Sequence, residues 1–247
     1  MKSIKITGIG SYAPEKVITN DQLSSILDTS DEWIYTRTGI KRRHVVSGNE
    51  TALSLATKAA QKALDFANVK ANEIDLIIVG TSLPDNLYPS AACELQREIE
   101  AVNAFGFDLV AACSGFVFSI STAAMYLRAS HYKKALVVGV DVHSRFVDWK
   151  DRSTCVLFGD GAGAVILETS ENATDDILAI DLNSDGIRGG VLNIPLSGKN
   201  CPLVEPKTAE TSFVYMNGRE VFKFAISDVP KSIKKVIEEA HLTLDKI

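Results

Sequence analysis

Long hydrophobic runs are missing from this sequence of 247 residues. No apolar stretch approaches the ~20 residues that a membrane-spanning helix requires. The N-terminus also lacks the apolar core of a signal peptide. We therefore expect a cytoplasmic protein that does not insert into membranes. A hydrophobic content of 46% still allows a sizeable core in one large or two small domains.

An excess of basic residues is also missing. The chain has 26 Lys and Arg against 31 Asp and Glu, which gives a formal net charge of −5. Affinity for nucleic acids usually depends on clustered basic side chains, so the composition argues against a nucleic-acid-binding protein. One basic run, Lys41-Arg42-Arg43, is expected to be a solvated strand or turn.

Cysteine is scarce, and its four positions carry no pairing pattern. So few cysteines exclude a disulfide scaffold, and the absence of Cys-x-x-Cys argues against a metal site. Cys93 lies among alanines in a predicted helix and Cys155 lies in a predicted strand, so we expect both to be structural. Cys201 stands in a predicted loop and is expected to have no catalytic role.

Strand-like and helix-like segments alternate through the first part of the chain. Apolar runs predict strands over 4–9, 74–79, 105–110 and 135–142, and helical spacing predicts helices over 52–64, 90–99 and 115–127. A further helix is expected to start at Thr29-Ser30-Asp31-Glu32. This order indicates an α/β fold whose mostly parallel sheet is covered by helices.

A glycine-rich segment, 159–163, lies near the end of the predicted first half. Strands over 155–158 and 164–167 are expected to flank a tight turn there, because the glycines lack dinucleotide-binding spacing. A polar stretch at 168–176 is expected to divide the chain into halves, 1–170 and 171–247. The second half should contain a strand over 177–182 and helices over 215–226 and 229–240.

Cys113 is notable for its position between a predicted strand and the predicted helix over 115–127. A thiol at a helix N-terminus is favoured as thiolate by the helix dipole and the free backbone N–H groups. The same N–H groups can stabilise an oxyanion on an attacked carbonyl. From position alone, a nucleophile and a small buried core cysteine are both open interpretations.

The segment Ala111-Ala112-Cys113-Ser114-Gly115-Phe116 is one of five motifs in a common order. The other motifs are 29–34 with 36–40, 84–90, 151–154 with 158–164, and 216–223. Together they cover essentially the whole chain. They resemble the β-ketoacyl-acyl carrier protein synthase III family of thiolase-superfamily condensing enzymes.

This resemblance implies a thiolase-like layered α-β-α-β-α fold with mixed, mostly parallel sheets. It implies an acyltransferase that initiates fatty-acid synthesis through an acyl-Cys113 intermediate. The acyl donor would be an acyl-coenzyme A, expected to be acetyl-coenzyme A, and the acceptor would be malonyl-acyl carrier protein. No cofactor would be bound permanently, since coenzyme A enters as a substrate thioester, and the enzyme would be a homodimer.

The resemblance also assigns residues to the nucleotide end of coenzyme A. Trp33 and Arg152 would sandwich the adenine, because an indole and a guanidinium can both stack on a base. Thr29 and Arg37 would add polar contacts. Read without the family, Trp33 is a helix-face core residue and Arg37 is a surface charge.

Three further residues are assigned to the acyl end of the substrate. Tyr88 would reach across the dimer interface and close the partner's acyl pocket. Met216 and Phe222 would line the substrate channel. Without the family, Tyr88 is a loop aromatic beside a proline, and the other two residues pack a helix.

The sequence departs from the family where the second and third catalytic residues are expected. No His-Gln-Ala-Asn motif follows any of the four histidines, and His241 is expected on a helix surface. We therefore expect a C-terminally truncated chain with an incomplete second half, unstable alone because uncovered apolar area costs ~25 cal/mol per Å². The alternatives are a catalytically incomplete coenzyme A-binding or dimerisation fragment, or a related condensing enzyme with a different primer.

Overall fold

The computed structural model describes residues 2–171, 173–195 and 213–247. The chain separates into two compact units that interleave along the sequence. Unit 1 comprises Met1–Val17, His44–Val142 and Gly159–Ile180. Unit 2 comprises Ile18–Arg43, His143–Phe158 and Asp181–Ile247. The division into consecutive halves, 1–170 and 171–247, stays a prediction.

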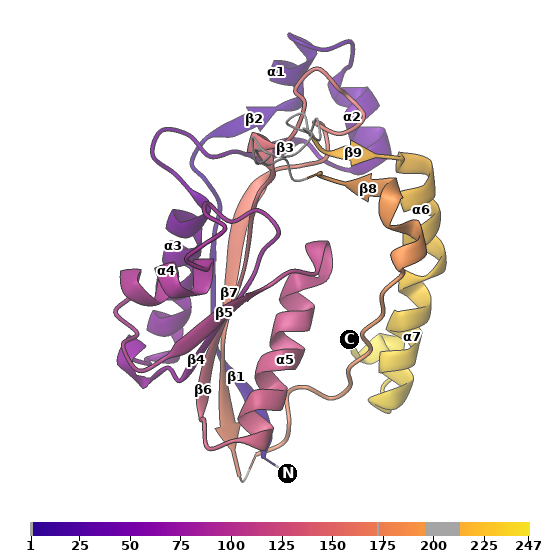
Figure 1. The fold of residues 1–247 in the computed structure, drawn as a ribbon. Helices are drawn as coiled ribbons and strands as arrows, with labels where there is room; N and C mark the ends of the chain where they lie inside the picture. Colours follow the sequence, from indigo (N-terminus) through magenta and orange to yellow (C-terminus); the bar gives the residue numbers. More distant parts are fainter. Residues whose placement is uncertain (1, 172, 196–212) are drawn as a thin grey trace, which may run out of the picture. The chain divides into compact units, whose positions relative to one another are not determined.

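Unit 1 is built on a five-stranded sheet with the order β1-β7-β6-β4-β5 (Figure 1). The strands are β1 (Ser3–Tyr12), β4 (Leu76–Gly80), β5 (Phe105–Leu109), β6 (Lys134–Val142) and β7 (Asp160–Ser170). Strand β4 is parallel to β5 and β6, whereas β7 is antiparallel to β1 and β6. Every strand except β7 therefore runs in one direction, which confirms a mixed, mostly parallel sheet.

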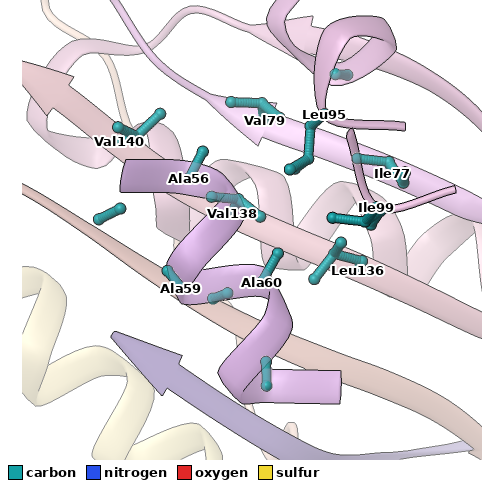
Figure 2. Packing of buried hydrophobic residues seen from close by; sticks show 14 of the residues in the cluster. Ala56, Ala59, Ala60, Ile77, Val79, Leu95, Ile99, Leu136, Val138 and Val140 are labelled. Carbon is teal, nitrogen blue, oxygen red and sulfur yellow. The ribbon is translucent and has the colours of Figure 1, made fainter. Parts of the chain in front are cut away.

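Helices cover both faces of this sheet. Helices α3 (Ala52–Ala67) and α4 (Ala91–Glu98) pack on one face, and α5 (Gly115–Ala129) packs on the other. Side chains alternate along a strand, so Ile77 and Val79 face α3 and α4 while Leu76 and Ile78 face α5. Figure 2 shows the alanines of α3 lying against apolar side chains of β4, β6 and α4.

Two strand predictions in the second part of the chain are wrong. Residues 155–157 form turns. Of the glycines expected to make a tight turn, Gly161 and Gly163 lie inside the single long strand β7, and Gly159 precedes it. Gly163 pairs with Gly139 of β6 on one side and Ser11 of β1 on the other. Hydrogen bonding from both neighbours holds this glycine-rich segment extended despite its low intrinsic strand propensity. Segment 177–182 also forms no strand.

Unit 2 consists of short elements and contains its own apolar cluster. Its helices are α1 (Asn20–Ser24), α2 (Asp31–Thr38), α6 (Gly218–Ser227) and α7 (Val229–Glu239), and its two-stranded sheet pairs β8 (Leu192–Asn193) with β9 (Tyr215–Met216). Strand β2 (Val17–Thr19) pairs with β3 (Arg42–His44) at the junction of the two units. The cluster includes Leu23, Ile34, Val147, Val156 and Val214.

The helix predicted over 215–226 begins later than expected, at Gly218. Asn217 caps it, because its side chain accepts a hydrogen bond from the Glu220 N–H at 3.3 Å. Residues Tyr215–Met216 pair with β8 instead. Among the described residues, no helix combines the length and apolar character that crossing a bilayer demands.

Candidate active site

The thiol of Cys113 lies at the start of α5. Strand β5 ends at Leu109, and a short 3-10 turn, Ala112–Ser114, leads directly into the helix. Ala112 has a φ of 46°, in the left-handed region that a residue with a Cβ adopts only at an energetic cost. Cys113 is exposed. The structure therefore excludes the interpretation of Cys113 as a buried core cysteine.

Glycines allow the first turn of α5 to approach the sheet closely. A Cβ on Gly80, at the end of β4, would lie 2.8 Å from the backbone of Gly115. A Cβ on Gly139 of β6 would lie 3.1 Å from the side chain of Phe116. Because neither strand carries a side chain at these points, the first turn of α5 lies directly on the parallel strands β4 and β6.

A cavity of about 360 Å³ opens beside Cys113 within unit 1. It is lined by Gly80, Ala112, Cys113, Phe116, Gly139, Val140, Asp141, Gly159, Gly161 and Gly163. Asp141, near the end of β6, connects this strand to the residues that follow β4. Its carboxylate accepts hydrogen bonds from Thr81 Oγ1 at 3.2 Å and from Ser82 N at 3.0 Å. The lining places the Cys113 thiol beside Asp141 and the glycines of β7, and includes no histidine.

Unit 2 brings Trp33, Arg37 and Arg152 together. Ser30 caps α2 by accepting a hydrogen bond from Trp33 N at 3.1 Å, and this places the indole on the first turn. The guanidinium carbon of Arg37 lies 4.5 Å from the indole centroid, and that of Arg152 lies 5.0 Å from it. A base between Trp33 and Arg152 needs roughly 7 Å, twice a ~3.5 Å stacking contact. Arg152 must therefore move for the predicted adenine sandwich to form.

Arg152 is held in place by its neighbours. Its guanidinium donates to the backbone oxygen of Asp28 and lies 3.6 Å from that residue's carboxylate. Arg152 lies in a turn that Asp151 stabilises. The Asp151 carboxylate accepts hydrogen bonds from Ser153 N at 2.9 Å and from Thr154 Oγ1 at 2.9 Å. Burial alone would raise the pKa of Asp151, but these hydrogen bonds outweigh it and lower the pKa.

The remaining predicted site residues are dispersed. Thr29 Oγ1 is buried and has no hydrogen-bond partner among the described residues. Tyr88 is 87% exposed on a loop of unit 1. In unit 2, Met216 lies half-buried on β9 and Phe222 is exposed on α6. The roles of all four residues stay predictions.

Sequence reasoning missed the burial of Arg43. The run Lys41-Arg42-Arg43 was expected to be solvated, but Arg43 is only 5% exposed. Its guanidinium donates to Asn20 Oδ1 and to two backbone oxygens, and burial lowers its pKa. The available signal was strand alternation on β3, which turns Arg42 outward and Arg43 inward.

The other cysteines and His241 differ in part from expectation. Cys93 lies on a helix as expected, α4, and is exposed, and its structural, non-catalytic role stays a prediction. Cys155 is fully buried as expected, but in a turn, and burial raises its pKa to about 11. Cys201 lies outside the described residues. His241 is exposed but follows the end of α7, with a φ of 55°.

Similarity to known proteins agrees with this fold. Residues 107–186 match the family described as 3-oxoacyl-[acyl-carrier-protein (ACP)] synthase III. The β-ketoacyl-[acyl-carrier-protein] synthase III of Clostridium acetobutylicum is 49% identical over 247 residues, which are 100% of this chain and 75% of the relative. The crystal structure of 3-oxoacyl-[acyl-carrier-protein] synthase III from Aquifex aeolicus VF5 superposes with a TM-score of 0.88 and 39% identity, covering 100% of this chain and 74% of that one.

A second similar structure is the priming β-ketosynthase of the R1128 polyketide biosynthetic pathway. Its TM-score is 0.87 at 33% identity, and the match covers 98% of this chain and 71% of that one. The fold and the setting of Cys113 define a thiolase-like condensing enzyme. The chain belongs to the β-ketoacyl-[acyl-carrier-protein] synthase III family, as the motifs predict. It spans 75% of the length of its Clostridium acetobutylicum relative.

Proposed function

We propose that this protein is an acyltransferase that initiates fatty-acid synthesis. Cys113 takes an acyl group from an acyl-coenzyme A, with acetyl-coenzyme A as the expected donor. The acyl group is then condensed with malonyl-acyl carrier protein, with loss of carbon dioxide. The observation that carries this proposal is the exposed Cys113 at the N-terminus of α5, in a chain 49% identical to a named synthase III.

The acylation step follows from the setting of Cys113. The positive end of α5 favours the thiolate, which attacks the carbonyl carbon of the thioester. Backbone N–H groups at the helix start stabilise the tetrahedral oxyanion. When that intermediate collapses, the bond from carbon to the coenzyme A sulfur breaks, a bond to Sγ of Cys113 remains, and coenzyme A leaves as a thiolate.

Trp33, Arg37 and Arg152 are the proposed contacts for the nucleotide of coenzyme A, with Thr29 as a polar contact. An indole presents a face for stacking, and guanidinium groups bind phosphate. The proximity of the two arginines to Trp33 supports this assignment. Coenzyme A is a substrate in this scheme, and no permanently bound cofactor is proposed.

A homodimer is the proposed assembly, formed through the edge strand β5. In the sheet order, β5 ends one side of the sheet, which leaves backbone groups ready for pairing with a second copy. Exposed apolar residues lie on this strand, at its end and on neighbouring α5, among them Phe105, Val110, Val117 and Tyr126. Tyr88 keeps its proposed role of closing the partner's acyl pocket. Met216 and Phe222 keep their proposed role of lining the substrate channel.

Two alternatives remain distinct from this proposal. The first is a non-catalytic coenzyme A-binding or dimerisation fragment, which coenzyme A binding without acyl transfer to Cys113 would favour. A condensing enzyme with a different primer is favoured by the similarity to a priming β-ketosynthase of polyketide synthesis. Comparing acylation rates for acetyl and longer acyl donors separates the two primer assignments.

Intact-mass measurement after incubation with acetyl-coenzyme A tests the proposal. We expect one acetyl group on the protein, located on Cys113 by peptide mapping. Replacing Cys113 by Ser should abolish it, whereas replacing Cys93, the other exposed described cysteine, should leave it unchanged. A folded protein that binds coenzyme A but never acetylates Cys113 would support the non-catalytic alternative.

A further inference from the structure

Two buried polar side chains, Asn20 and Arg43, connect the segments of unit 2 that carry Trp33 and Arg152. Asn20 is 1% exposed and Arg43 is 5% exposed. Nη2 of Arg43 donates to Asn20 Oδ1 at 2.7 Å and to the backbone oxygen of Val156 at 3.2 Å. Nη1 of Arg43 donates to the backbone oxygen of Ile18 at 3.2 Å. One guanidinium thus joins its own strand to two other stretches of chain, residues 18–20 and Val156.

Asn20 extends the connection to both ends of α2. Its Nδ2 donates to Asp31 Oδ1 at 2.8 Å and to the backbone oxygen of Ile40 at 2.8 Å. Asp31 is the first residue of α2, and Ile40 lies just after its end. One buried amide therefore contacts both ends of the helix that carries Trp33, whose Ile34 also packs in the apolar cluster.

Val156 extends the connection in the other direction, to Arg152. The two residues belong to one turn, in which Cys155 N donates to the backbone oxygen of Asp151 at 3.1 Å. A shift of Val156 is transmitted through this hydrogen-bonded turn to Arg152. Asn20 and Arg43 therefore lie on a continuous path between the indole and the guanidinium that are 5.0 Å apart.

The chemistry of Arg43 argues for a role beyond stability. Its acceptors are all neutral oxygens, and its buried Nε has no partner among the described residues. A guanidinium buried without a carboxylate carries a desolvation penalty that an apolar side chain of similar length avoids. An apolar side chain cannot hold residues 18–20 and Val156 at defined hydrogen-bond distances from β3.

We propose that Asn20 and Arg43 are positioning residues that set the spacing between Trp33 and Arg152, and thereby the preference of the enzyme for nucleotide-bearing thioesters. This inference rests on the proposed function, because it assumes that these two side chains contact coenzyme A. Neither Asn20 nor Arg43 touches the reacting atoms in this scheme.

The test compares Cys113 acetylation by acetyl-coenzyme A with acetylation by a thioester of N-acetylcysteamine, which has no nucleotide. Arg43→Met removes the hydrogen bonds but keeps a long side chain, and Asn20→Asp replaces the donor to Asp31 by a like charge. For both variants we expect KM for acetyl-coenzyme A to rise about ten- to a hundredfold with kcat retained. The rate with the short thioester should stay unchanged. Arg42→Gln, on the exposed side of the same strand, is the matched control and should behave as wild type.

Equal losses with both donors, or an unchanged KM for acetyl-coenzyme A, would overturn the positioning role. Arg43→Lys keeps the charge but loses the planar fork, so it should show the same donor-selective loss in a folded protein. Urea unfolding confirms that each variant is folded. If wild type shows no preference for acetyl-coenzyme A over the short thioester, the proposed nucleotide contacts themselves are wrong, which is a separate result.

Discussion

At the scale of single residues, two cysteines show how surroundings determine thiol chemistry. Cys113 is exposed at the start of α5, where a substrate can reach its thiol. Cys155 is fully buried in the apolar cluster of unit 2, and burial raises the pKa of its thiol to about 11. The same side chain is therefore proposed as a nucleophile in one place and is inert packing in the other.

The raised pKa of Cys155 predicts a loss of stability at alkaline pH. Folding favours the neutral thiol. The stabilising contribution of burying Cys155 is therefore complete below the ordinary thiol pKa of 9.0, and it is lost as pH rises towards about 11. Across that window we expect wild type to lose about 2–3 kcal/mol of unfolding free energy relative to Cys155→Ala. Urea unfolding of both proteins at several pH values measures this difference, and a constant difference would contradict the prediction.

At the scale of secondary-structure elements, a strand residue caps a helix that lies apart from it in sequence. Asp108 of β5 accepts hydrogen bonds from the backbone N–H groups of Ala91 and Ala92, both at 2.8 Å. Ser90 also accepts from Cys93 N at 3.2 Å. Three of the N–H groups that begin α4 are thereby satisfied, and the carboxylate complements the positive end of the helix.

Removal of the Asp108 carboxylate should weaken the attachment of α4 to the sheet. We expect Asp108→Ala to lower the free energy of unfolding by about 1–2 kcal/mol, because two buried N–H groups lose their acceptor. Chemical denaturation measures the change, with Glu15→Ala as the control at an exposed acid. A change no larger than the control would show that solvent replaces the carboxylate without loss.

At the scale of the whole molecule, the exposed edge of the unit 1 sheet predicts self-association. Val110 directly follows β5 and is 76% exposed, which is unfavourable for an apolar side chain at an unpaired edge. We expect analytical ultracentrifugation to show a dimer, and Val110→Lys to raise its dissociation constant at least about tenfold, ~1.4 kcal/mol. Phe66, 68% exposed on α3 beside the opposite edge strand, provides the matched control. A dimer insensitive to Val110→Lys but disrupted by Phe66→Lys would place the interface elsewhere.

Much of unit 1 was predictable from local sequence pattern. The apolar runs of β4 and β6 and the spaced alanines of α3 satisfy the periodicity of their elements, so each signal is contained within one segment. The position of Cys113 was readable for the same reason, because a strand, a short turn and a helix follow one another directly. The family membership was likewise carried by short motifs in order, and similarity to known synthases confirms it.

Other features were decided only by tertiary contacts. The glycines of β7 look like a turn in isolation, and they are extended because two neighbouring strands bond to them. Arg43 has the composition of a surface residue, and it is buried because oxygens from Ile18, Asn20 and Val156 converge on it. Local pattern determined which elements form, since each follows from residues a few positions apart. Long-range hydrogen bonds determined which polar residues enter the core, because their partners come from distant parts of the chain.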